Sequence, residues 1–255
     1  MRRLAALVVV ACAAAIVTIG LAAAQGDAQD EAKAIIGKAI KAMGYENKAV
    51  PKGMRMKAKG TVDANGMSLE IVQNLTIRMP NQFKDVTEVN VNGMTISVTT
   101  IFDGKEAWID FNGMVKDLGE KMVEEFKNVA GMVEASHLTP LLDKKFKLSI
   151  VGEAKVEGQP AVGIRISGKG FKDFNMYIDK KTNLIAKIER QAVDPMTEME
   201  VQEERIFKSY RDMDGRKVPK NVSVNRDGNK FVEAEVLEYN FVDQIDPGEF
   251  AKPKK

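Results

Sequence analysis

Apolar and polar residues alternate along most of this chain. From Met67 to Met79 the odd positions read Met, Leu, Ile, Gln, Leu, Ile and Met, and the even positions are polar except for Val72. The same period of two recurs at 94–98, 146–150, 162–166, 174–178 and 184–188. Such a period buries one face of a strand and leaves the other in water, so it predicts an antiparallel sheet.

Turn signals lie between these stretches. Asn-Gly occurs at 65, 92 and 112, and Asp-Gly at 103, 214 and 227. Both residues of each pair tolerate a positive φ, so each pair predicts a two-residue hairpin. Because residues 92–113 contain three of them, that segment is predicted to be a meander of short strands. In 230–242 the apolar phase is even up to Val236 and odd from Leu237, which predicts a bulge or sharp bend that curls the sheet.

Two segments have a helical period instead. Residues 27–45 place Ile35, Ile36, Ala39, Ile40 and Met43 on one face and end at Gly44. Residues 118–142 align Met122, Phe126, Val129 and Val133, and this helix is predicted to end before Pro140. The predicted fold class is therefore mainly β (α+β). It is a strongly curved antiparallel sheet, or incomplete β-barrel, that covers two or more amphipathic helices within a single domain, residues 25–255.

The first residues resemble a secretory signal. Arg2 and Arg3 precede an apolar run from Leu4 to Ala24, and "AAA" stands just before Gln25. We therefore expect residues 1–24 to be a signal peptide and the rest to be exported to the periplasm. The apolar run is also long enough to span a bilayer, so an uncleaved inner-membrane anchor is the alternative. Cys12 is interpreted as a small residue inside the signal and not as a lipoprotein cysteine, because an apolar stretch follows it.

Composition excludes several classes of function. The chain has 38 Lys and Arg against 36 Asp and Glu, and removing Arg2 and Arg3 leaves 36 against 36. Because the exported part has no excess of basic residues, its composition argues against nucleic acid as a partner. The exported part has no cysteine, so it has neither a disulfide nor a thiolate metal site.

No pattern of residues indicates catalysis. His137 is the sole histidine, and G-x-S-x-G and H-E-x-x-H are both absent. His137 lies at the end of a predicted helix, so it is interpreted as a surface or dipole-pairing residue. The acidic segment 194–204 lacks the spacing of a calcium-binding loop. It is interpreted as a solvent-exposed turn followed by the exposed face of a strand. We expect no enzyme, no catalytic residue, no metal and no cofactor.

The number of methionines is the one unusual feature that could indicate a function, since 13 of the 14 methionines lie in the exported part. A flexible thioether suits a ligand of variable shape, and it suits a gap-filling core equally well. For Trp108, packing in the core or at a rim is favoured over ligand contact. If the concave face is a ligand site, the apolar residues expected to line it are Ile40, Leu69, Ile71, Met94, Ile96, Trp108, Phe126 and Met176.

Four segments together resemble a known family. They are "IFDGKEAWIDFNG", "FNMYIDKKTNLIAKIER", "YRDMDGRKVPKNVSVNRDGNKFVEAEVLEYNF" and "IDPGEFAKP". In order and spacing they are similar to the LolA/LolB-like superfamily of periplasmic lipoprotein carriers, in a variant like exported proteins of planctomycete-type bacteria. The resemblance covers most of residues 28–253. It implies an incomplete barrel whose apolar cavity holds acyl chains, with no individual site residue carried over.

Two functions follow as expectations. The first is a periplasmic binding protein that holds acyl chains of lipoproteins or other lipids for sorting to the outer membrane, with an inner-membrane release complex and an outer-membrane receptor as further partners. The second is an envelope structural or sensor protein on the same fold with a filled cavity. Free cavity volume separates the two.

The signal predicts where the mature chain begins. Protein purified from the envelope fraction should start at about Gln25, because signal peptidase cleaves after small residues in the A-x-A arrangement. N-terminal sequencing and intact mass check this. Membrane-bound protein that starts at Met1 would replace cleavage with anchoring, and a lipidated Cys12 would overturn both.

Overall fold

The computed structural model describes residues 17–253 except 65 and 196. Arg2, Arg3 and Cys12, on which the signal-peptide prediction rests, lie outside the described residues, as does Asn65 of the first predicted turn.

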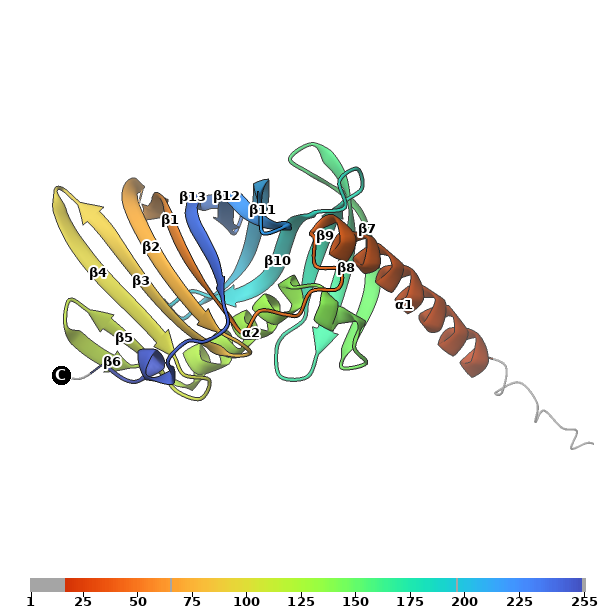
Figure 1. Ribbon diagram of the computed structural model, residues 1–255, viewed down its shortest axis with the longest axis horizontal. Coiled ribbons are helices and arrows are strands. Elements are labelled where there is room, and N and C mark those ends of the chain that lie inside the picture. Colours follow the sequence, from red (N-terminus) through yellow and green to blue (C-terminus); the bar gives the residue numbers. More distant parts are fainter. Residues whose placement is uncertain (1–16, 65, 196, 254–255) are drawn as a thin grey trace, which may run out of the picture.

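The described strands form one 13-stranded sheet. A first meander comprises β1 (Gly53–Ala64), β2 (Met67–Arg78), β3 (Gln82–Val91), β4 (Met94–Phe102), β5 (Ala107–Phe111) and β6 (Met114–Asp117). A second comprises β7 (Phe146–Val156), β8 (Gln159–Gly168), β9 (Phe174–Asp179), β10 (Ile185–Val193), β11 (Glu200–Met213), β12 (Arg216–Arg226) and β13 (Asn229–Val242). β1 and β13 pair antiparallel at the centre and join the two meanders. β6 and β7 remain the free edges, so the sheet is an incomplete barrel, as predicted (Figure 1).

The predicted turns fall between consecutive strands. Asn92 and Asn112 adopt φ of 52° and 49°, and the glycines that follow them are also left-handed, which gives the tight β3–β4 and β5–β6 hairpins. Asp103 differs, because it starts a longer connection between β4 and β5. Its Oδ1 accepts hydrogen bonds from the backbone N–H groups of Lys105 and Glu106.

The predicted bend in the last strand is confirmed. Between Lys57 and Ala58 the register against β13 moves from Glu238 to Val236, so Leu237 is an extra residue. Just beyond, a Cβ on Gly60 would lie 2.0 Å from the backbone oxygen of Glu233, so only glycine allows the two strands to approach this closely. The bulge and this glycine curl the sheet at its centre.

The first helix closes one end of the sheet. α1 (Val17–Ala42) begins earlier than the apolar pattern predicts, and its side chains are described from residue 28. Ile36 and Ile40 pack with Phe146 and Ile164 in the largest buried cluster. Gln29 accepts a hydrogen bond from the Leu148 backbone N–H at 2.9 Å, which satisfies part of the free edge of β7.

The second helix lies on the concave side. α2 (Glu120–Ser136) crosses the inner face of the strands in Figure 1 and is followed by a short 3-10 turn, η1 (Thr139–Leu142). Met122 and Phe126 pack against Phe83 and Phe102, with the rings of Phe83 and Phe126 5.0 Å apart. This aromatic cluster holds the N-terminal half of α2 against β3 and β4.

His137 corrects the sequence interpretation. It was interpreted as a surface or dipole-pairing residue at a helix end. It does stand at the C-terminal end of α2, but it is only 5 % exposed. Its ring lies 5.9 Å from that of Tyr45, and its Nδ1 has no hydrogen-bond partner. Burial, with a smaller contribution from Arg216, lowers the pKa of His137 to about 4. The reason is tertiary, because α1 and its following turn cover this end of α2.

The C-terminal segment covers the outer face of the first meander. In the 3-10 turn η2 (Pro247–Phe250), Phe250 is fully buried beside Ile101, Trp108 and Ile245. Arg55 donates to both carboxylate oxygens of Glu249, at 3.0 and 2.7 Å. The segment therefore packs on the face of the first meander opposite α2.

We expect Phe250→Ala to lower the free energy of unfolding by about 3 kcal/mol, since it removes a fully buried ring and leaves a cavity. Phe111→Ala is the matched control, because that ring is 42 % exposed and should cost less than about 1 kcal/mol. Urea denaturation monitored by circular dichroism measures both. Equal losses would show that the C-terminal turn does not pack on the sheet.

His137 should make stability depend on pH. Its folded pKa is depressed, so the unfolded chain binds the proton more readily. The contribution is present above pH 6.5 and is lost as pH falls towards 4, by about 3 kcal/mol in total. The carboxylates titrate in the same range, so the measurement is the difference between the unfolding profiles of wild type and His137→Gln from pH 7.5 to 4. Parallel profiles would contradict the burial of this ring.

Candidate ligand cavity

An apolar cavity of about 200 Å³ lies between the two helices and the inner face of the sheet. Its walls come from the turn after α1, the C-terminal half of α2, and strands β1, β2 and β10–β13. Four of its lining residues are methionines, namely Met43, Met54, Met56 and Met132. Because a methionine side chain repacks easily, this wall can adapt its shape.

Three tyrosines also line the cavity, and each has a raised pKa because it is buried. The pKa of Tyr45 is about 12, and those of Tyr210 and Tyr239 are raised too. The Tyr210 hydroxyl donates to the Ile185 carbonyl at 2.7 Å, and that of Tyr239 donates to the Met54 sulfur at 3.0 Å. At neutral pH these groups are uncharged, so they leave the wall apolar.

A second cavity of about 290 Å³ continues beneath the N-terminal half of α2. It shares Leu75, Ile77, Val133 and Arg205 with the apolar cavity, so the two are adjacent. Its other walls are more polar and include Asp85 of β3 and several charged side chains from α2, β10, β11 and β12.

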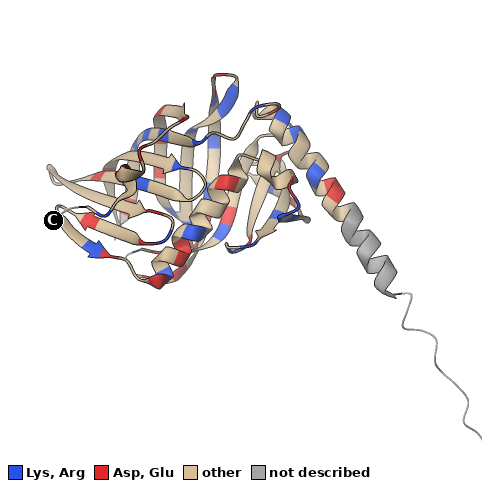
Figure 2. Ribbon diagram, turned by 60° about the horizontal axis from the view of Figure 1, so that its bottom comes forward, with Lys and Arg blue, Asp and Glu red and all other residues tan. Residues whose placement is uncertain are grey.

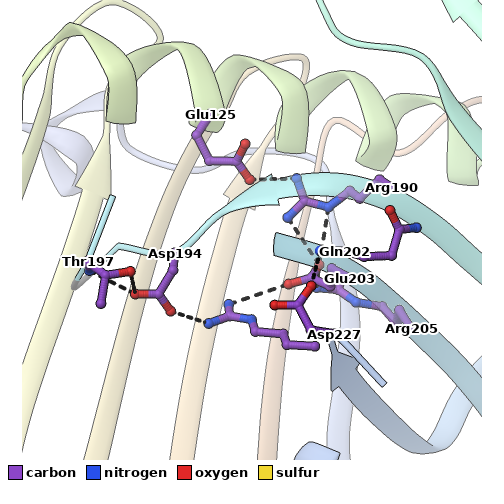
Figure 3. A network of polar contacts seen from close by, with 9 residues as sticks. Glu125, Arg190, Asp194, Thr197, Gln202, Glu203, Arg205 and Asp227 are labelled. Atoms are coloured by element: carbon purple, nitrogen blue, oxygen red, sulfur yellow. Dashed lines mark hydrogen bonds and ion pairs between the residues drawn. The ribbon is translucent and has the colours of Figure 1, made fainter. Parts of the chain in front are cut away.

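Those charges form a buried chain of ion pairs (Figure 3). Arg190 of β10 reaches Glu125 of α2 at 2.5 Å and Glu203 of β11 at 3.1 Å. Arg226 of β12 reaches Glu203 at 3.4 Å and Asp194 at 2.7 Å. Burial would raise the pKa of Glu203, but the guanidinium groups of Arg190, Arg205 and Arg226 hold it below its usual value.

Asp85 lies apart from this chain. Its two carboxylate oxygens accept from the Gln73 amide at 2.5 Å and from the Thr87 hydroxyl at 2.9 Å. Desolvation raises its pKa despite these bonds, so Asp85 is more easily neutralised than an ordinary carboxylate.

A larger hollow of about 1020 Å³ lies at a rim of the sheet and is an open groove. Its walls are the segment before β1, the β2–β3 turn, η1 and the chain after β13, including Lys52, Arg78, Asp143 and Asp246. Its charged walls make it a poorer acyl site than the apolar cavity, although it is larger. Elsewhere both signs of charge are spread over helices and strands (Figure 2).

The predicted lining residues lie in several places. Ile40 and Met176 belong to the packed cluster beneath α1, and Phe126 lines the second cavity. Trp108 faces outward beneath Phe250, and Met94 is 67 % exposed at a hairpin end. Leu69 and Ile96 are half-buried. Ile71 is buried and borders a hollow of about 480 Å³ lined by β1, β2, β11, β12 and β13. Their contact with a ligand stays a prediction.

Sequence reasoning missed the charged residues of the site. It placed Glu203 on the exposed face of a strand, but Glu203 is only 4 % exposed. The interpretation is wrong because two arginines from other strands neutralise this carboxylate inside the concavity. A signal was present, since Glu203 and Arg205 share the alternation phase of Phe207, an apolar residue that marks the inward face.

Two further observations concern the described residues alone. They contain no group of three or more His, Cys, Asp or Glu side chains placed to hold a metal ion. None of their helices combines the length and apolar character that a membrane span requires.

Comparisons with known proteins place the fold. No family model matches the chain, and no curated protein matches it in sequence. Among the solved structures similar to it are three for which the match covers 97 % of the solved chain. The first is a DUF1329 family protein from Desulfovibrio piger, with a TM-score of 0.53, 12 % identity and 86 % of this chain covered. The second is a putative outer membrane lipoprotein-sorting protein domain from Vibrio parahaemolyticus, with a TM-score of 0.53, 11 % identity and 88 % of this chain covered.

The third is a LolA superfamily protein from Nitrosomonas europaea, with a TM-score of 0.51, 8 % identity and 87 % of this chain covered. At such identities the likeness concerns architecture alone. It agrees with the open antiparallel sheet and the helix on its concave side. The chain has a LolA-like fold.

Proposed function

We propose that this protein is a non-enzymatic periplasmic binding protein that holds an acyl chain, of a lipoprotein or another lipid, between α2 and the sheet. The observation that carries the proposal is the apolar cavity between the helices and the sheet, whose wall includes four methionines and three tyrosines. Apolar walls with few polar groups are typical of sites for apolar ligands. The LolA-like fold and the expected signal peptide support the same conclusion.

The energy of such binding comes from the chain itself. Each methylene moved from water into the cavity contributes about 0.8 kcal/mol before ordering costs. The second cavity, which shares Leu75 and Val133 with the first, offers further space to a bulkier ligand. An inner-membrane release complex and an outer-membrane receptor would be the partners of a carrier in lipoprotein sorting.

One observation favours an alternative function. The apolar cavity, at about 200 Å³, is smaller than the roughly 300 Å³ at which ligand sites usually begin. An envelope structural or sensor protein with a nearly filled interior fits that volume. Native mass spectrometry of protein from its own envelope separates the two, because a carrier retains a lipid mass.

Val133→Phe should weaken binding by about tenfold or more, because the added ring takes the space of about two methylenes. The assay is displacement of the fluorescent probe N-phenylnaphthylamine by hexadecanol. Val151→Phe adds the same bulk at a 46 % exposed position of β7 and should bind like wild type. Thermal melting of each variant confirms folding. Cooperative melting of wild type without saturable probe binding would replace the carrier with the filled scaffold.

A further inference from the structure

Arg205 of β11 stands where the two cavities meet and lines both. It is the one permanently charged side chain among the described residues that line the apolar cavity. About a third of its side chain (36 %) is accessible even at this depth in the concavity. Arg205 therefore borders the space that an acyl chain would fill.

Its charge is the least compensated in the cluster. Among the described residues, its one ion pair is with Glu203, at 3.8 Å. Glu203 already accepts from Arg190 and Arg226, each of which has a second carboxylate partner. The Arg205 Nε is enclosed and has no hydrogen-bond partner.

The remaining nearby carboxylate is Asp85, on the opposite wall of the second cavity. Its oxygens accept hydrogen bonds from Gln73 and Thr87. The charge of Arg205 lowers the pKa of Asp85, but desolvation has the larger effect and raises it. An oxyanion that came with a ligand would supply Arg205 with the close, planar partner that the protein does not.

Resting on the proposed function, we propose that the ligand is an amphiphile whose apolar chain ends in an oxyanion, held by the Arg205 guanidinium where the two cavities meet. A guanidinium presents paired N–H donors that match the two oxygens of a carboxylate or phosphate. The apolar cavity takes the chain, and Leu75 and Ile77 flank the junction. A fatty acid and a lipid phosphate share this chemistry.

The test compares three ligands of equal chain length by displacement of N-phenylnaphthylamine at pH 7.5 and low salt: hexadecanoate, hexadecyl phosphate and hexadecanol. Wild type should bind at least one anion about tenfold to a hundredfold more tightly than the alcohol, as expected for a hydrogen bond to a charged group. The preferred anion identifies the headgroup. Arg205→Gln should remove this preference, so that the anions bind no more tightly than hexadecanol, whereas Arg205→Lys should keep part of it.

Arg165→Gln is the matched control, since it removes an arginine whose side chain is 55 % exposed on β8. Each variant is checked by thermal unfolding, and if Arg205→Gln does not fold, the wild-type preference and its decline in high salt decide the question. Equal binding of anions and alcohol would overturn the oxyanion site while leaving the acyl site intact. Failure of all three ligands to displace the probe would overturn the proposed function itself, and with it this inference.

Discussion

The buried ion-pair chain that joins Glu125, Arg190 and Glu203 is the constraint on which the interior depends. Removing charges from water costs several kcal/mol per ion, and only close pairing offsets this cost. A shift of α2 would separate Glu125 from Arg190 and leave both charges buried without a partner. We therefore interpret the chain as fixing where α2 lies more than as adding stability. Because α2 forms one wall of both cavities, their shape follows from that position.

The two ends of the sheet are filled differently. Under α1, Ile36, Ile164 and Met176 are fully buried in a continuous cluster that leaves little space. Beneath α2 the helix instead leaves the two cavities between itself and strands β1–β5 and β10–β13. The proposed function rests on the part under α2, where this space remains.

Particular residues show how far the pattern reached. Trp108 and Ile109 lie on opposite faces of the sheet, as neighbours in a strand must, but alternation does not show that η2 covers the side of Trp108. Ile40 and Met176 were expected on inward faces and are buried, yet they pack in the cluster beneath α1. Met94 alternates like a buried residue but lies at a hairpin end, where the sheet has no cover. Parity alone cannot distinguish a covered face from an open one.

The sequence by itself determined the strands, the hairpins, the bulge at Leu237 and the two helices, because period and turn chemistry act between residues a few positions apart. The tertiary structure decided which charges are buried and where space remains. Glu125 and Arg190 are 65 positions apart, and His137 is covered by a ring from the turn after α1. Such burial depends on which distant segments share the concave face. The role proposed for Arg205 therefore emerges only once β11, α2 and β2 surround it.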